Sequence, residues 1–132
     1  QNNCCGTSSQ AHTTCYRHQV FTTTAAVVST LNIPYGKYQT TFQSRLGSDA
    51  WLKPYTADTL QQLPKKGIKK LIIVCPAFVS DCLETIEEIG EEGKEIFLEA
   101  GGESYTVIPC LNTEPLWIKA INTIINEHSS LY

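Results

Sequence analysis

The chain has 132 residues, a formal net charge of −3, 42% hydrophobic residues and 17% charged residues. This length and composition predict one globular domain and exclude a disordered chain. The one basic cluster, Lys65 to Lys70, flanks a short turn, and the lack of a clustered basic face argues against a nucleic-acid partner. Neither a bilayer-spanning apolar run nor a secretory signal is visible. Because the sequence contains no Met, we expect Gln1 to be an internal residue of a longer protein.

The first half of the chain predicts a polar loop followed by two helices. Residues 1–13 are small and polar, and they predict a loop or insert that contains cysteines. A loosely helical apolar pattern predicts a helix over 14–31, which Asn32 and the following Pro and Gly end. Residues 38–42 predict a short strand, and 47–54 predict a loop that carries Trp51. Thr56 can cap a helix that ends at Leu63.

The second half alternates strands with helices. The continuous apolar run at 71–75 is typical of a parallel strand covered on both faces. A long helix is predicted over 81–100, where Gly101 and Gly102 end it, followed by a strand at 105–108 and a helix at 113–127. This order predicts an α/β fold with a three-layer, Rossmann-like parallel sheet. Ligands bind such sheets at the carboxyl ends of the strands, which places 43–51, 76–84 and 109–112 at one rim.

Six carboxylates recur on the long predicted helix at spacings of three and four residues. In an α-helix they would share a sector of roughly 80°. Such a column suits the transfer of a divalent cation, and mutual repulsion would raise some of the pKa values. The alternatives are a solvated face and a capping box made by the first two carboxylates. Gly90 and Gly93 predict a local irregularity in the helix, of the kind that often marks functional sites. The six are Asp81, Glu84, Glu88, Glu92, Glu95 and Glu99.

Five motifs together resemble the signature of the ferrochelatases, the enzymes that insert ferrous iron into a porphyrin. The resemblance covers about residues 14–127, and it is specific because order and spacing agree across all five motifs. It implies that 14–132 is the C-terminal, chelatase-like α/β domain of a two-lobe enzyme, preceded by a cysteine-containing insert at 1–13. The motifs are FQSRLG at 42–47, WLKPYT at 51–56, PAFVSDCLET at 76–85, FLEAGG at 97–102 and IPCLN at 108–112.

The resemblance also implies roles for individual residues. Glu84 matches the catalytic carboxylate that faces the porphyrin and either abstracts protons or handles the metal. Glu88 and Glu92 match acidic residues along a metal or proton path, on a helix with a π-type irregularity, and Asp81 matches the residue that orients this site. Cys82 stands where animal members have a histidine, and a packed structural role is the alternative for this thiol. The residues implied for the porphyrin pocket are Trp51, Ser44 and Phe78.

Other parts of the family's machinery are not found in this sequence. The histidine of a His-Ser/Gly-x-Pro motif precedes this segment in the family, so we expect the chain to fold but to be inactive without the N-terminal half. Cys4, Cys5 and Cys15 lie where some bacterial ferrochelatases carry four cysteines that bind a [2Fe–2S] cluster. Three thiols leave this set one ligand short, so a zinc site and a free-thiol loop remain alternatives.

The resemblance implies Fe²⁺ as substrate and a porphyrin, either protoporphyrin IX or coproporphyrin III, as its acceptor in haem biosynthesis. It implies a bacterial cytoplasmic location and leaves peripheral association with the inner membrane open. Two other functions fit the same pattern. One is a chelatase that inserts cobalt or nickel into a related tetrapyrrole, and the other is a non-catalytic α/β ligand-binding module with a solvated acidic helix.

Overall fold

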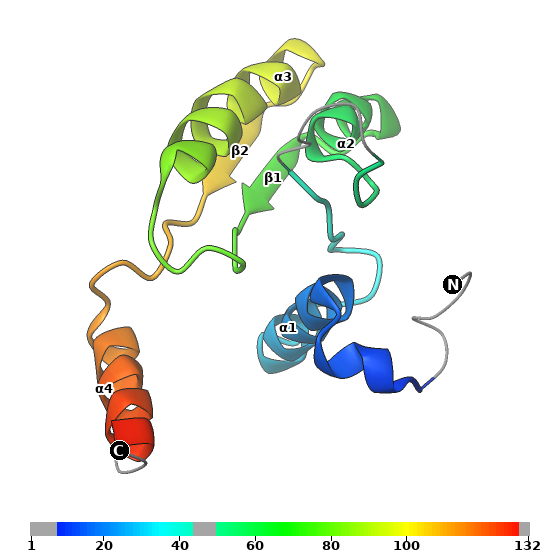
Figure 1. Ribbon diagram of the computed structural model, residues 1–132. Helices are drawn as coiled ribbons and strands as arrows, with labels where there is room; N and C mark the ends of the chain where they lie inside the picture. Colours follow the sequence, from blue (N-terminus) through cyan, green and yellow to red (C-terminus); the bar gives the residue numbers. More distant parts are fainter. Residues whose placement is uncertain (1–7, 44–49, 130–132) are drawn as a thin grey trace.

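The computed structural model describes residues 8–43 and 50–129 (Figure 1). Its helices follow the predicted order, and each is found within a few residues of its expected bounds. The mixed class with a parallel sheet is therefore confirmed. In chain order the elements are η2 (Gln10–Thr13), α1 (Tyr16–Thr30), α2 (Thr56–Gln62), η3 (Pro64–Lys66), β1 (Lys70–Ile73), the π-helix η4 (Glu84–Glu92), α3 (Gly93–Glu99), β2 (Ser104–Val107) and α4 (Pro115–Ser129).

The sheet of the described residues has two parallel strands, β1 and β2, joined through η4 and α3. The register pairs Leu71 with Tyr105 and Ile73 with Val107. The strand predicted at 38–42 is wrong, because Phe42 makes only an isolated parallel bridge with the segment before α2. Its backbone N–H donates to the Pro54 carbonyl at 2.9 Å, and its carbonyl accepts from the next helix start at 3.1 Å. These two bonds use the groups that a third strand would have offered to the sheet.

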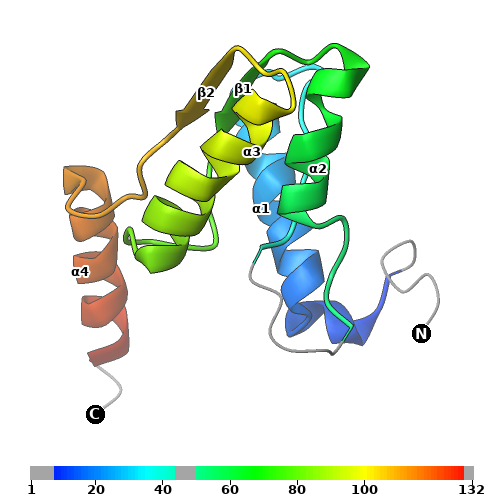
Figure 2. The same ribbon diagram turned by 90° about the horizontal axis from the view of Figure 1, so that it is seen from above.

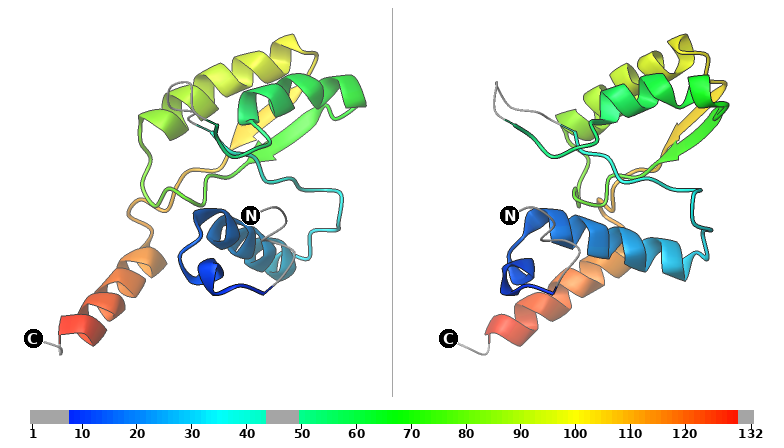
Figure 3. Two further views of the ribbon diagram at one scale, coloured as in Figure 1. Left: turned by 45° about the vertical axis from the view of Figure 1, so that its right-hand side comes forward. Right: turned by 90° about the vertical axis from the view of Figure 1, so that its right-hand side faces the viewer.

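Helices lie on both sides of the sheet, but they do not cover its two faces equally. Helices α2 and α3 lie side by side on one side, and α1 and α4 lie on the other (Figures 2 and 3). In β1, Leu71 and Ile73 are half-buried, whereas Ile72 is 70% exposed and Val74 just beyond the strand is 51% exposed. The expectation that both faces are covered is therefore met on one face, and the other remains open among the described residues.

The core lies where α2, η4 and α3 meet. Its buried apolar residues are Leu60, Ile89 and Phe97, together with Phe42, and Phe97 has no exposed surface. The helix that carries Phe97 ends in a hydrogen-bonded glycine turn, because the Gly102 N–H donates to the Phe97 carbonyl at 2.9 Å. Gly101 takes a left-handed φ of 98° there, which glycine adopts without strain. The predicted glycine stop is confirmed.

Helices α1 and α4 carry large apolar side chains that the described residues leave uncovered. Leu31, at the end of α1, is 64% exposed, and Leu116 and Ile125 of α4 are 75% and 57% exposed. Within 8–43 and 50–129, none of the helices combines the length and the apolar character needed to cross a membrane.

Candidate functional site

The candidate site lies at the edge where both strands of the sheet end. The loop after β1 spans 74–83 and leads into η4, and the loop after β2 spans 108–114 and leads into α4 (Figure 1). Because the strands are parallel, both loops leave the same edge. Ligands of parallel α/β sheets bind outside this edge. The acidic helix thus begins at the rim where chemistry is expected.

The acidic helix is π-helical from Glu84 to Glu92 and α-helical afterwards. A Cβ on Gly90 would lie 3.3 Å from a carbonyl oxygen one turn earlier, and a Cβ on Gly93 would lie 2.6 Å from the Tyr105 Oη. That hydroxyl donates to the Ile89 carbonyl at 2.6 Å, so it satisfies a backbone acceptor inside the π-helix. The irregularity predicted from the two glycines is confirmed, and π-helical turns are frequent at functional sites.

Asp81 joins the two rim loops through its carboxylate. Its Oδ2 accepts a hydrogen bond from Asn112 Nδ2 at 2.6 Å. Its Oδ1 accepts from Thr85 Oγ1 at 3.0 Å and from the backbone N–H of Cys110 at 3.3 Å. The Asn112 bond is the largest of the causes that hold the pKa of Asp81 below its ordinary value. The carboxylate is therefore ionised at neutral pH and ties the start of the acidic helix to the loop after β2.

Glu84 is the first residue of the π-helix and is half-buried. Its contact with the Cys82 side chain, followed by its own backbone N–H, holds the pKa of its carboxyl below the ordinary value. The capping-box alternative requires this carboxylate to accept from the Asp81 backbone N–H. That N–H instead donates to Asn112 Oδ1 at 2.8 Å. The capping box is not formed, so this alternative for Glu84 is wrong.

The prediction that crowding raises carboxylate pKa values is wrong for these two residues. The pKa values of Asp81 and Glu84 are both lowered, in each case because hydrogen bonds favour the charged form. Both residues are half-buried and keep contact with solvent, where water and salt screen repulsion between like charges. The hydrogen-bond donors therefore decide the direction in which the two pKa values shift.

Glu88, one position further along the acidic column, contacts the loop that carries the predicted indole. Gln43 Nε2 donates to Glu88 Oε2 at 2.9 Å, and Trp51 Nε1 donates to the Gln43 carbonyl oxygen at 2.9 Å. Gln43 thus connects the indole to the π-helix. It was missed as a site residue, although its place in the motif at 42–47 was a signal that marked it.

The carboxylates beyond Glu88 lie on a different face. Glu92 is exposed at the end of the π-helix, where it lines an open hollow of about 540 Å³ with four other carboxylates. Glu87 and Glu91, which lie outside the predicted sector, share this surface. The wider π-helical turn changes which side chains align, so a projection with α-helical geometry groups them incorrectly. Glu92 is thus exposed, whereas Glu84 and Glu88 are half-buried. The five carboxylates of the hollow are Glu87, Glu91, Glu92, Glu95 and Glu99.

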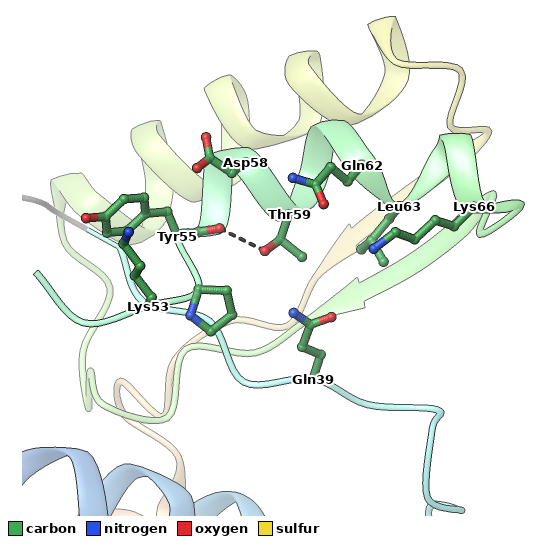
Figure 4. A pocket seen from close by; sticks show the side chains of 9 residues that line it. Gln39, Lys53, Tyr55, Asp58, Thr59, Gln62, Leu63 and Lys66 are labelled. Carbon is green, nitrogen blue, oxygen red and sulfur yellow. Dashed lines mark hydrogen bonds between the residues drawn. The ribbon is translucent and has the colours of Figure 1, made fainter. Parts of the chain in front are cut away.

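A second hollow lies beside α2 and away from the acidic helix. Its volume is about 430 Å³, and Figure 4 shows Lys53 and Lys66 at its two ends with Gln39 opposite the helix. Thr59 Oγ1 donates to the Tyr55 carbonyl at 2.8 Å within it. None of the six predicted carboxylates lines this hollow, so it is not part of the candidate site.

Comparison with known proteins decides the family. The ferrochelatase family model matches residues 6–129. The chain belongs to the ferrochelatase family. It is 53% identical over 117 residues to the ferrochelatase of Opitutus terrae, covering 89% of this chain and 34% of that protein. It is 50% identical over 122 residues to a ferrochelatase of Pseudomonas fluorescens, covering 92% and 36%. The chain thus spans about a third of the length of these ferrochelatases.

The remaining residues implied by the ferrochelatase resemblance are placed only in part. Phe78 lies in the loop after β1, is 37% exposed and donates its backbone N–H to the Cys75 carbonyl at 2.9 Å. Trp51 is 40% exposed. Ser44 lies outside the described residues, as do Cys4 and Cys5. The structure therefore brings Trp51 to the π-helix through Gln43, and it places Phe78 on the rim.

The described residues do not form a resident metal centre. Within 8–43 and 50–129, no three His, Cys, Asp or Glu side chains converge on a point where a metal could bind. Cys15 is the residue that precedes α1, and its thiol is free and half-buried. The other two cysteines predicted for a [2Fe–2S] cluster, Cys4 and Cys5, lie outside the described residues.

Proposed function

We propose that this chain is the C-terminal part of a ferrochelatase that inserts Fe²⁺ into protoporphyrin IX or coproporphyrin III. One observation supports this most directly: the half-buried Glu84 and Glu88 lie on a π-helix that begins at the ligand-binding edge of the sheet, and Trp51 is linked to Glu88 through Gln43. Residues 14–132 would form the chelatase-like domain, and 1–13 would form a cysteine-containing insert. The substrates are then iron and a porphyrin, and the partner is the N-terminal half of the enzyme.

The chemistry distinguishes between the two candidate roles of Glu84. Fe²⁺ replaces the two pyrrole N–H protons, so two protons leave for each iron inserted. A general base works best with a pKa near the operating pH, but the pKa of Glu84 is held below its ordinary value. An ionised carboxylate holds iron(II) without the strong grip of a thiolate. Of its two candidate roles, metal handling at the pyrrole nitrogens therefore fits Glu84 better than proton abstraction.

The expected test is a comparison between the chain alone and a chimera. We expect the purified chain to show no iron insertion into a porphyrin, because the family's histidine motif is not found in its sequence. A chimera in which residues 6–129 replace the matching segment of the Opitutus terrae ferrochelatase should be active, and haem formation measured by absorbance would show it. An inactive but folded chimera, or robust insertion by the chain alone, would contradict the proposal.

Two other functions are separated by simple measurements. A cobalt or nickel chelatase would make the chimera prefer those metals over iron. A non-catalytic ligand-binding module would bind without turnover and would not need the carboxylates. We expect divalent metal to quench Trp51 fluorescence, and we expect Glu84→Gln and Glu88→Gln to abolish the quenching. Unchanged quenching in both variants would favour the solvated-helix alternative.

The proposals for the cysteine-bound cluster and for the cellular location rest on the resemblance alone. A [2Fe–2S] cluster on Cys4, Cys5 and Cys15 needs a fourth ligand from outside this set, and a visible absorption spectrum of the anaerobically purified longer protein would test it. A zinc site or a free-thiol loop would lack that spectrum. The proposed location is the bacterial cytoplasm, with any contact to the inner membrane being peripheral.

A further inference from the structure

Asn112 makes three hydrogen bonds to the segment that leads into the acidic helix. Its side-chain Oδ1 accepts from the Asp81 backbone N–H at 2.8 Å, and its Nδ2 donates to Asp81 Oδ2 at 2.6 Å. Its backbone N–H donates to the Val79 carbonyl at 2.9 Å. One side chain therefore holds both the backbone and the carboxylate of the same partner, across a separation of 31 residues along the chain.

The backbone of Asn112 explains which residues this position accepts. Its φ is 46°, in the left-handed region that favours glycine and, among other residues, asparagine. Glycine would suit this backbone but would lose both side-chain bonds. Aspartate would suit it nearly as well but would put a second carboxylate against Asp81. Asparagine thus combines the conformation with one donor and one acceptor.

These contacts continue from Asp81 into the first turn of the acidic helix. Thr85, which is 3% exposed, donates its hydroxyl to Asp81 Oδ1 at 3.0 Å. The same hydroxyl oxygen accepts from the Cys82 backbone N–H at 3.0 Å. Glu84 lies between Cys82 and Thr85 in the sequence, and both are held by these bonds. Its backbone is therefore fixed by a set of bonds that begins at Asn112, in the loop after β2.

We infer that Asn112 is a positioning residue for metal insertion, which sets the place of Glu84 through Asp81 and Thr85 without touching the substrate. This inference rests on the proposed function. A displacement of about 1 Å in a reacting group can cost roughly 100-fold in rate. Loss of Asn112 should therefore lower turnover, while porphyrin binding, which depends on the pocket walls, should change little.

The test compares Asn112→Gly with Asn32→Gly. Asn32 is the matched control, because it also has a left-handed φ, of 52°, but it follows α1, where its backbone N–H donates to the Ser29 carbonyl at 3.2 Å. In the chimera, Asn112→Gly should lower kcat roughly 10-fold to 100-fold with KM for porphyrin within about twofold of the parent. Asn32→Gly should change neither. Asn112→Asp keeps the size and backbone preference, and it should lower kcat at least as much at neutral pH.

A second measurement is independent of activity. NMR titration of the chain itself should show the Asp81 midpoint moving to higher pH in Asn112→Gly and not in Asn32→Gly, because the main donor to its charged form is lost. If the parent chimera is active, two results would overturn the positioning role alone. One is a kcat of Asn112→Gly within twofold of the parent, and the other is a change of kcat and KM together. An inactive parent chimera would overturn the proposed function and the role with it, even where the titration shows the bond.

Discussion

Replacing Glu84 with glutamine in the active chimera is expected to lower the rate of iron insertion by roughly 100-fold or more. Glutamine keeps the size of the side chain but removes the charge. The carboxylate is half-buried at the ligand-binding edge and is held in its ionised form by the contact with Cys82, so its charge is available to a cation at neutral pH. Steady-state assays across iron concentrations should show that kcat falls and that the dependence on iron weakens.

Glu87→Gln is the matched control for this prediction. Glu87 lies on the same π-helix three residues further on, but it is exposed and lines the open hollow of five carboxylates. We expect its activity to stay within about twofold of the parent, because the removal of a solvated charge has little effect at the site. Equal losses in the two variants would show that the net charge of the helix matters, and not the position of Glu84. Near-parent turnover of Glu84→Gln would exclude it from the reaction.

Local sequence signals predicted most of the fold. The apolar run at 71–75 predicted a strand, and the structure has β1 at Lys70–Ile73. The glycines at 101 and 102 predicted the end of a helix, and α3 ends at Glu99. Gly90 and Gly93 predicted an irregularity where the π-helix lies. Each of these signals depends on residues within a few positions of one another, which is why they could be read without tertiary structure.

The features that the sequence did not predict depend on partners far away along the chain. Phe42 bonds to the segment at 54–56 rather than to a sheet, and β-propensity alone could not identify that partner. Gln43 reaches Glu88 across 45 residues, and Asn112 reaches Asp81 across 31. The lowered pKa of Asp81 followed mainly from the Asn112 donor. Spacing within one helix therefore identified the acidic residues, but their surroundings decided which of them are half-buried at the rim.

Replacing Phe97 with alanine is expected to lower the free energy of unfolding by about 3–5 kcal/mol. Phe97 has no exposed surface and is one of four buried apolar residues in the described part of the chain. Domains of ordinary size are stable by only about 5–15 kcal/mol, so this loss would remove much of the stability. Urea unfolding followed by circular dichroism would measure it. Leu98→Ala, at the neighbouring position with 38% exposure, should cost roughly 1 kcal/mol or less.

Phe97→Ala should also disturb the site, because Tyr105 contacts both the core and the acidic helix. The Phe97 ring lies 5.8 Å from the Tyr105 ring, centroid to centroid, and the Tyr105 hydroxyl holds the Ile89 carbonyl inside the π-helix. A cavity beside Tyr105 would free that ring to move, and the backbone around Ile89 would lose a partner. Amide hydrogen exchange across residues 84–92 should therefore be faster in Phe97→Ala than in Leu98→Ala under conditions where both are folded. Equal exchange would show that the π-helix holds its shape without support from the core.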